Sequence, residues 1–392
     1  MNKKEVYSIY CTGCGLCQSY MNVIFEYEKN GFSHPILSNK EEIDFCEKVC
    51  PANGKHLMRQ TDSIWGHYLT VFKGYSTNKE IRYKAASGGV ITSLAIFLLK
   101  EKKVDGIIQI GEKKENPFAT QSYLSITEED IINRCGSRYI VSSPLSEICQ
   151  ILEKGGKYVF IGRPCDIIAL NNFLIEFPKF RDNIFCTLTF FCAGVPSVEA
   201  SKRLVASLGI KPSEVRKIRY RGYGWPGQAT IFDSKNVQKS MDYIISWNQF
   251  LGRDIRSICK FCTDGVGEDA DISCGDLWNL KNERPYFEES EGLNVIFSRT
   301  NKGNSLLIEA FEKGYIQLSD YQENIKELYY VQPNHSTKKK FLYPRLLGLK
   351  LIKHPIPYYN LKKLKVFCKK ESFINNLRNT IGTMRRAILK KI

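Results

Sequence analysis

Several patterns of common enzyme classes are missing from the sequence. There is no HExxH pattern of zinc proteases, no GxSxG nucleophile elbow and no GxxxxGKS/T phosphate-binding loop. No GxGxxG fingerprint stands between a strand pattern and a helix pattern, so a Rossmann-type NAD site is unsupported. The five histidines are dispersed along the chain. These absences leave hydrolase and nucleotide triphosphatase chemistry without support, and no catalytic side chain is assigned.

Long apolar stretches are absent as well. No run of about 18 apolar residues occurs, which predicts that the chain has no transmembrane helix. The opening residues, MNKKEVYSIYCTGCG, contain no apolar signal-peptide core and no cleavage site. We therefore expect a cytoplasmic protein, in a compartment where thiols stay reduced. The fourteen cysteines are accordingly expected to be ligands rather than disulfides.

Acidic residues are scarce at the end of the chain. Of the 57 Lys and Arg residues, 16 follow His335, against one acidic residue, Glu371. The preceding part is therefore nearly neutral, although the net charge of the chain is +16. A nucleic-acid-binding protein spreads basic residues over its folded surface, so we expect no nucleic-acid partner.

The basic end contains an amphipathic helix pattern, FINNLRNTIGTMRRAILKKI. Its basic residues, Arg378, Arg385, Arg386, Lys390 and Lys391, lie largely off an apolar stripe. Two interpretations stand: peripheral contact with the anionic inner face of a membrane, or a helix docked on the body with its charged face in water. The apolar residues recur at steps of three and four and are Phe373, Ile374, Leu377, Ile381, Met384, Ile388 and Ile392.

The patterns along the chain predict an α/β fold in three parts. Residues 1–67 are interrupted by cysteines and turn residues and are predicted to form a small ferredoxin-like module. Residues 75–330 alternate strand and helix patterns, which indicates an α/β domain, and residues 336–392 form the basic tail. The expected strands are DGIIQIG, KYVFIG, NIFCTLTFFCAG and NVIFSR. The expected helices are VITSLAIFLLKEK, RPCDIIALNNFL, PSVEASKRLVASLG and NSLLIEAFEKG, and VRKIRYRGYGWPGQATIF is an expected hairpin.

The first cysteine motif is CTGCGLC, with Cys11, Cys14 and Cys17 three residues apart. This spacing, with glycines that let backbone amides approach, is typical of a 4Fe–4S cluster. Such motifs end in a cysteine followed by proline, and Cys50 precedes Pro51, so Cys50 is the predicted fourth ligand. A zinc knuckle is the alternative, although zinc sites prefer two pairs of ligands. Cys46 is left over as a further ligand or a packed thiol.

A second set of cysteines is scattered. Cys165 and Cys192 each follow an apolar strand, and open α/β sheets place ligands at the carboxyl ends of such strands. Cys259 and Cys262 form a CxxC pair, which suits zinc, redox or cluster chemistry. From spacing alone, a second cluster and its absence remain equally open, and Cys274 is another candidate. Buried structural thiols are expected for Cys135, Cys149, Cys186 and Cys368.

Six motifs occur in order along the chain: the cysteine motif above, AASGGV, GRPCDIIAL, CAGVPS, RGYGWPG and CKFCTDGVGEDADISCGD. Together they resemble the coenzyme F420 hydrogenase/dehydrogenase beta-subunit family, and the resemblance covers roughly Cys11 to Arg299. Members of that family bind FAD and one or more 4Fe–4S clusters, and some are encoded beside polysaccharide-assembly genes. The resemblance implies a second cluster held by Cys165, Cys192, Cys259 and Cys262. It does not settle Cys274.

The resemblance also implies an FAD site. Ser87, Gly88 and Gly89 open a predicted helix and suit the pyrophosphate, against the alternative of an ordinary helix cap. Arg163 is expected to pair with phosphate or to form a salt bridge. Arg221, Trp225 and Gly227 form a turn that is expected to flank the flavin, although Trp225 could instead pack in the core. Asp276 is expected either to anchor the ribose or the ring of the flavin or to cap a turn.

These features together predict an iron–sulfur flavoprotein oxidoreductase. Electrons would pass between a reduced carrier, deazaflavin F420 or ferredoxin, FAD and 4Fe–4S clusters. The acceptor would be an unknown small molecule or a lipid-linked intermediate of polysaccharide biosynthesis, and the chain would work as a homo-oligomer or alone. The alternatives are an electron-transfer or scaffold subunit with clusters but no flavin, and a structural protein held by zinc.

Overall fold

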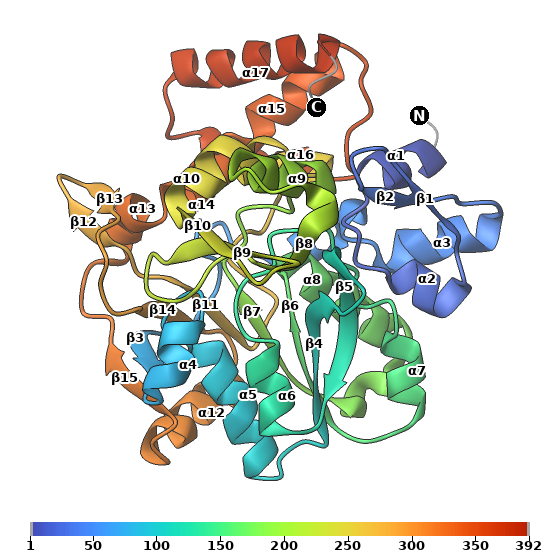
Figure 1. Cartoon of the computed structure of the whole chain (residues 1–392). Helices are drawn as coiled ribbons and strands as arrows, with labels where there is room; N and C mark the ends of the chain where they lie inside the picture. The colour runs from blue at the N-terminus through green and yellow to red at the C-terminus, as the bar shows by residue number, and fades with distance from the viewer. Residues whose placement is uncertain (1–2, 390–392) are drawn as a thin grey trace.

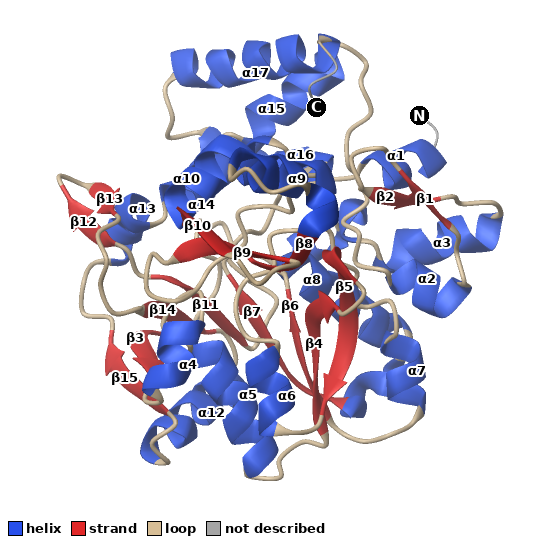
Figure 2. Cartoon of the chain, viewed as in Figure 1, coloured by secondary structure: helices blue, strands red, loops and turns tan. Residues whose placement is uncertain are grey.

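A computed structural model describes residues 3–389 of the chain (Figure 1). Its centre is a mixed sheet of eight strands, seen in red in Figure 2. The α/β architecture expected from the sequence is therefore present, as a mixed rather than a purely parallel sheet. In order across the sheet, the strands are β15 (Ile316–Asp320), β3 (Thr70–Ser76), β14 (Asn294–Ser298), β11 (Ile272–Asp276), β7 (Ile184–Phe190), β6 (Tyr158–Gly162), β4 (Gly106–Lys113) and β5 (Asn116–Ser125).

The middle of the sheet is parallel. β4 pairs with β6, β6 with β7 and β7 with β11, all in the same direction. The outer strands pair antiparallel: β5 with β4, β14 with both β11 and β3, and β15 with β3. Since the carboxyl ends of β6, β7 and β11 lie at one edge, the loops that follow them meet there.

Helices cover both faces of this sheet. Alternate residues of β6 face opposite sides of the sheet, as in any strand. Val159 accordingly packs in one hydrophobic cluster, and Tyr158 and Phe160 pack in another. On the Val159 side lie α4 (Lys79–Lys84), α5 (Val90–Lys100), α6 (Glu128–Asn133) and α12 (Asn301–Glu312), and on the other α7 (Ile148–Glu153) and α8 (Pro164–Glu176). The predicted helices at α5, α8 and α12 are thus confirmed.

The predicted hairpin is confirmed and belongs to a second, smaller sheet. β8 (Val215–Arg219) pairs antiparallel with β9 (Gln228–Asp233), which pairs with β10 (Gln238–Asp242). α9 (Val198–Ser207) packs with this sheet. Its N-cap is Ser197, whose Oγ accepts a hydrogen bond from the Ala200 N–H at 2.9 Å. The remaining elements between α8 and β14 are short: η3 (Pro178–Asn183), η4 (Pro212–Glu214), α10 (Tyr243–Ile245), η5 (Ser246–Phe250), η6 (Leu251–Arg253), α11 (Ser257–Lys260), β12 (Asn279–Lys281) and β13 (Arg284–Tyr286).

The N-terminal cysteine region is built from short elements. They are α1 (Lys3–Ile9), α2 (Leu16–Met21), β1 (Phe25–Tyr27), β2 (Ser33–Pro35), α3 (Lys40–Val49), η1 (Pro51–Asn53) and η2 (Lys55–Met58). One hydrophobic cluster joins Tyr10 of this region to Phe261 of the central part and Tyr359 near the end. The division into parts at 67, 75, 330 and 336 stays a prediction.

The C-terminal part is helical. It contains η7 (Ile325–Glu327), α13 (Leu328–Val331), α14 (Pro333–Lys340), α15 (Leu342–Leu351), α16 (Leu361–Cys368) and α17 (Phe373–Ile388). α17 lies across α15 at the top of Figure 1. Within residues 3–389, no helix is both long enough and apolar enough to cross a bilayer.

The predicted amphipathic helix forms, with its apolar stripe turned outward. α17 contacts α15 through a small, polar face: Thr380 and Thr383 are buried, and Thr380 Oγ1 donates to the Pro344 carbonyl at 3.1 Å. Met384 is half-buried, while Lys390, Lys391 and Ile392 fall outside the described residues. The other apolar residues are 44% to 79% exposed: Phe373, Ile374, Leu377, Ile381 and Ile388.

Arg299 ties the N-terminal region to the sheet, so its replacement tests this packing. The buried guanidinium donates from Nη1 to the carbonyls of Trp65 (2.6 Å) and His67 (2.7 Å) and from Nη2 to that of Val266 (2.9 Å). We expect Arg299→Met to lower the free energy of unfolding by at least about 3 kcal/mol, because three carbonyls lose their donor. Denaturant titration measures the loss.

The exposed Arg216 on β8 supplies the control for this experiment. Arg216→Met removes the same charge from the surface and should change stability by less than about 0.5 kcal/mol. Equal unfolding midpoints for the two variants would show that Arg299 does not hold the regions together.

Candidate functional site

Four N-terminal cysteines lie together in the structure. Burial raises the pKa of Cys50, and the charges of Cys14, Cys11 and Cys17 raise it further. Charges act this way only at short range, so the four thiols of the predicted first cluster are neighbours. Burial likewise raises the pKa of Cys14 to about 12. The loop is stabilised by hydrogen bonds from Gly13 N–H to Cys11 Sγ (3.3 Å) and from Leu145 N–H to the Cys14 carbonyl (2.8 Å).

Two further residues contact this group. The thiol of Cys46, on α3, donates to Cys17, which lowers the pKa of Cys17 and raises that of Cys46. The guanidinium of Arg256 lies so close that a Cβ on Gly13 would come within 2.9 Å of its Nη2. Arg256 donates from Nη1 to the carbonyls of Ser33 (2.7 Å) and Cys11 (3.4 Å). Its buried Nε and Nη2 find no acceptor among the described side chains and backbone.

The second predicted set of cysteines is also brought together. On top of burial, the charges of Cys192 and Cys259 raise the pKa of Cys165. Burial, with Cys259 and Cys192 adding to it, raises the pKa of Cys262 to about 12. Cys165 starts α8 after β6, Cys192 follows β7, and the CxxC pair lies on and after α11. The two strand ends and this short helix therefore meet at the carboxyl edge of the sheet.

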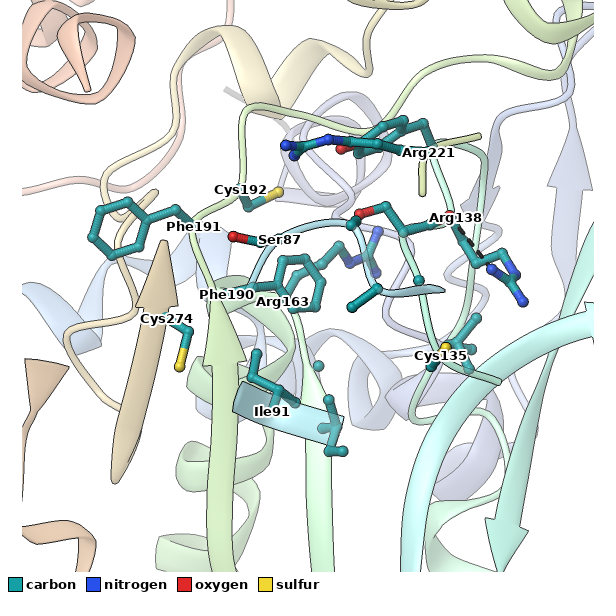
Figure 3. Close-up of a pocket in the computed structure, with 18 of the residues that line it drawn as sticks. Ser87, Ile91, Cys135, Arg138, Arg163, Phe190, Phe191, Cys192, Arg221 and Cys274 are labelled. Atoms are coloured by element: carbon teal, nitrogen blue, oxygen red, sulfur yellow. Dashed lines mark hydrogen bonds between the residues drawn. The ribbon is translucent and has the colours of Figure 1, made fainter. Parts of the chain in front are cut away.

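Cys274 lies apart from these two groups. Cys274 lies on β11, where burial alone raises its pKa, and Figure 3 shows its thiol pointing away from Cys192. All fourteen cysteines are free thiols. Among residues 3–389, no three His, Cys, Asp or Glu side chains are arranged to hold a single metal ion.

A large pocket opens at the same edge of the sheet (Figure 3). Its empty space, counted out to the open mouth, is about 1360 Å³. The ends of β6, β7 and β11, the start of α5 and residues 134–144 form its walls. Cys192, a member of the second cysteine group, lies on the wall beside Phe191.

Five of the eight predicted flavin-site residues line this pocket: Ser87, Gly89, Arg163, Arg221 and Asp276. Gly88 instead packs against backbone, since a Cβ there would lie 3.0 Å from both the Asn294 N and the Gly74 O. Trp225 and Gly227 lie behind the wall, outside the lining. Gly227 has φ +78°, and a Cβ would meet the carbonyl of Gly222 at 2.6 Å, so glycine is needed for this turn.

Arg221, Asp276 and Trp225 form one network at the pocket wall. Arg221 donates from both terminal nitrogens to the Asp276 carboxylate (2.8 and 2.9 Å), and the Trp225 indole N–H donates to Asp276 Oδ1 (2.8 Å). Trp225 stacks on Trp278 with ring centroids 4.7 Å apart. Trp225 is thus a packing residue that orients Asp276, and Asp276 pairs with an arginine rather than capping a turn.

Arg163 forms the salt bridge that was one of its two expected roles. Its Nε and Nη2 donate to the two oxygens of Asp166, each at 2.7 Å, and both side chains are buried. Its Nη1 is buried with no hydrogen-bond partner in the described part of the chain. The charges of Cys165 and Cys192 raise the pKa of Arg163, so its guanidinium lies near the second cysteine group. Because Arg163 also lines the pocket, this cation lies between the two.

Sequence reasoning missed two arginines near the pocket. Arg138 lines it, and Arg219 packs behind Gly136, where a Cβ would lie 2.9 Å from Arg219 Nη2. Buried N–H groups of both, at Nε of Arg138 and at Nε and Nη2 of Arg219, lack acceptors within residues 3–389. Burial lowers the pKa of Arg138, and the charge of Arg219 acts in the same direction. Such unsatisfied cationic donors fit an anionic ligand.

The RCGSRY segment at 134–139 contained the only sequence signal for this part of the wall. Two arginines flank a glycine there, and Gly136 takes φ +95°, a conformation that favours glycine. Arg219 lies in the middle of a strand pattern, and nothing local distinguishes it from a surface residue of a hairpin.

The Arg221–Asp276 pair offers a test of the pocket wall. Removing the carboxylate leaves a buried guanidinium without its counter-ion. We expect Asp276→Ala to lower the free energy of unfolding by about 3 to 5 kcal/mol, measured by chemical denaturation. Asp242→Ala, at an exposed aspartate that ends β10, is the control and should be nearly neutral. A neutral Asp276→Ala variant would mean that the network does not support the wall.

Comparison with known proteins agrees with this arrangement. Residues 71–150 match the N-terminal family model of the coenzyme F420 hydrogenase/dehydrogenase beta subunit, and residues 155–324 match the corresponding C-terminal model. The chain is 26% identical over 308 residues to coenzyme F420 hydrogenase subunit beta of Methanococcus voltae, covering 75% of this chain and 99% of that protein. It is 24% identical over 323 residues to the coenzyme F420-dependent sulfite reductase of Methanocaldococcus jannaschii, covering 76% and 45%.

A solved structure shares the fold. A chain of the F420-reducing NiFe hydrogenase complex from Methanosarcina barkeri, determined with xenon, superposes with a TM-score of 0.57 at 22% identity. The match covers 75% of this chain and 97% of that one. With both family regions matched over most of its sheet and pocket, the chain belongs to the coenzyme F420 hydrogenase/dehydrogenase beta-subunit family.

Proposed function

We propose that the chain is an iron–sulfur flavoprotein oxidoreductase. It would pass electrons between a reduced carrier, FAD in the pocket and two 4Fe–4S clusters. Cys165, Cys192, Cys259 and Cys262 would hold one cluster, and Cys11, Cys14, Cys17 and Cys50 the other. The observation that carries this proposal is the position of Cys192, which lines the pocket and also belongs to the second cysteine group.

The donor chemistry supports clusters at both groups. Each group offers four free thiols that are neighbours, and thiolates are the usual ligands of iron–sulfur clusters. A cluster with four thiolates carries negative charge, and a buried guanidinium lies beside each group: Arg256 at the first and Arg163 at the second. The unpartnered N–H groups of both arginines favour that negative charge.

The pocket supports a dinucleotide flavin. Open α/β sheets bind such ligands where loops follow the carboxyl ends of parallel strands, and this pocket opens at that edge. Arg138 and Arg219 would bind phosphate through their unsatisfied donors. Gly89 lines the pocket just before α5, in a turn with φ +80° that favours glycine. Asp276, held by Arg221 and Trp225, would accept a hydrogen bond from the ligand.

Each cofactor supplies a distinct chemistry when bound. Flavin exchanges two electrons with a hydride carrier and single electrons with clusters, which exchange one electron at a time. The protein contributes binding and orientation: Arg163 lies between the pocket and the second cysteine group, and Phe191 packs on the wall next to Cys192. The names of the relatives support F420 as the carrier, with ferredoxin as the other choice.

Anaerobic analysis of freshly purified protein tests the assignment. We expect about eight iron, about eight acid-labile sulfide and about one FAD per chain. In Cys192→Ser, iron should fall by about half, because one cluster loses a ligand while the first group is intact. Cys368→Ser, at a buried thiol of α16 remote from both groups, should keep the full complement.

The same measurement separates the alternatives. Iron and sulfide without flavin would indicate an electron-transfer or scaffold subunit. Zinc without sulfide would indicate a structural protein. Loss of flavin rather than iron in Cys192→Ser would mean that Cys192 serves the pocket and not a cluster.

The acceptor is proposed to be a small molecule or a lipid-linked intermediate, reached by peripheral attachment to an anionic membrane. The exposed apolar stripe of α17 supports this attachment, because the helix is docked through Thr380 and Thr383 and leaves the stripe in solvent. Arg378 and Arg385 lie beside the stripe, and each basic residue near an anionic bilayer contributes about 1 kcal/mol. The resemblance to polysaccharide-locus proteins is the support for a lipid-linked acceptor.

Vesicle co-sedimentation tests the attachment. Full-length protein should pellet with vesicles containing anionic lipid and less with zwitterionic vesicles. Ile381→Asp should reduce pelleting several-fold, because it removes an apolar side chain from the stripe. Asn375→Asp adds the same charge to another exposed position of α17 and should change pelleting much less. Equal pelleting of the two variants would contradict attachment through this stripe.

A further inference from the structure

Three side chains from distant parts of the chain meet between the two cysteine groups. His56 comes from η2, Thr263 follows Cys262, and Tyr359 lies between α15 and α16. His56 Nε2 and Thr263 Oγ1 are 2.8 Å apart, and a hydrogen bond also joins the side chains of Tyr359 and Thr263. The rings of His56 and Tyr359 are nearly perpendicular, with centroids 6.3 Å apart.

The segment 355–359 is fastened directly to the loop that follows Cys50. The Tyr358 N–H donates to the Ala52 carbonyl at 2.9 Å. A Cβ on Gly54 would come within 2.5 Å of the Tyr358 carbonyl oxygen, so the two backbones are in close contact. The Tyr10 hydroxyl donates to the Pro355 carbonyl at 2.6 Å. We call residues 355–359 the strap.

Tyr359 faces both cysteine groups. The charges of Cys262, Cys50 and Cys165 all act on its phenol, so it lies within reach of one group on each side. The ring also packs in the hydrophobic cluster that includes Cys50 and Cys259 at its margin. Tyr359 is therefore a wall shared by the two predicted cluster sites, and it is contributed by a segment outside both regions matched to the family.

The contact is closed to solvent. Tyr359 is 8% exposed, His56 is fully buried and Thr263 is 5% exposed. A smaller residue at 359 would open a space next to the hydroxyl of Thr263 and the imidazole of His56. Polar partners of this kind hold water in a cavity, whereas the aromatic ring excludes it.

We propose that Tyr359 is a positioning residue that keeps water out of the space between the two cysteine groups and thereby sets the reduction potentials of the clusters bound there. The inference rests on the proposed function. Reduction adds negative charge to a cluster, and water stabilises that charge. Loss of the ring should therefore shift the potentials of both clusters to more positive values.

Potentiometric titration followed by electron paramagnetic resonance tests this inference on anaerobic full-length protein. We expect a positive shift of both potentials in Tyr359→Ala and potentials close to wild type in Tyr359→Phe, which keeps the ring. Tyr358→Ala is the matched control: it removes the same ring from the strap, but Tyr358 packs on Tyr7 with centroids 5.7 Å apart and faces Lys3 and Glu47. Its potentials should match wild type.

The outcomes separate this inference from the proposed function. Wild-type protein with fewer than two clusters would overturn both. Two clusters in wild type with unshifted potentials in Tyr359→Ala would overturn the inference alone, as would a shift in Tyr359→Phe equal to that in Tyr359→Ala. If Tyr359→Ala loses iron, Tyr359→Leu is titrated in its place, and unshifted potentials there also count against the inference.

Discussion

Parallel pairing of β6 with β7 determines where the candidate site lies. The register places Gly162 opposite Thr189, so the chain leaves both strands side by side at one edge of the sheet. Cys165 and Cys192 follow these exits within a few residues, and the pocket opens between the same loops. A slip of one residue in either strand would turn its buried side chains to the other face and separate the pocket from the second cysteine group.

Buried positive charge is the second constraint on this region. Arg163 and Arg221 each have a carboxylate partner, whereas Arg256 has only backbone carbonyls. Burying a charge is costly unless it is paired, and buried pairs often add little to stability. Four arginines around the pocket and the cysteine loops have buried donors without acceptors in the described part of the chain, and such donors suit anionic groups: Arg138, Arg163, Arg219 and Arg256.

Local patterns in the sequence were sufficient for much of the fold. The helix after Ser197, the hairpin before Gln228 and the strand preceding Arg163 depend on residues close together in the chain, and each forms. The two cysteine groups were also foreseen as sets, from spacing for the first and from family resemblance for the second. The parts that were missed depend on contacts between distant segments. Arg219 and Tyr359 have no local sequence signature. The exposure of the apolar stripe of α17 depends on how this helix packs against α15, which the sequence of the helix alone does not show.

The strap has a consequence for how the protein matures. Tyr10 and Pro355, which are hydrogen-bonded to each other, are 345 positions apart in the chain. During synthesis the CTGCGLC loop therefore emerges long before the segment that covers the Cys50 loop. Until translation has passed Tyr359, the first cysteine group therefore stays open on the side that the strap later covers.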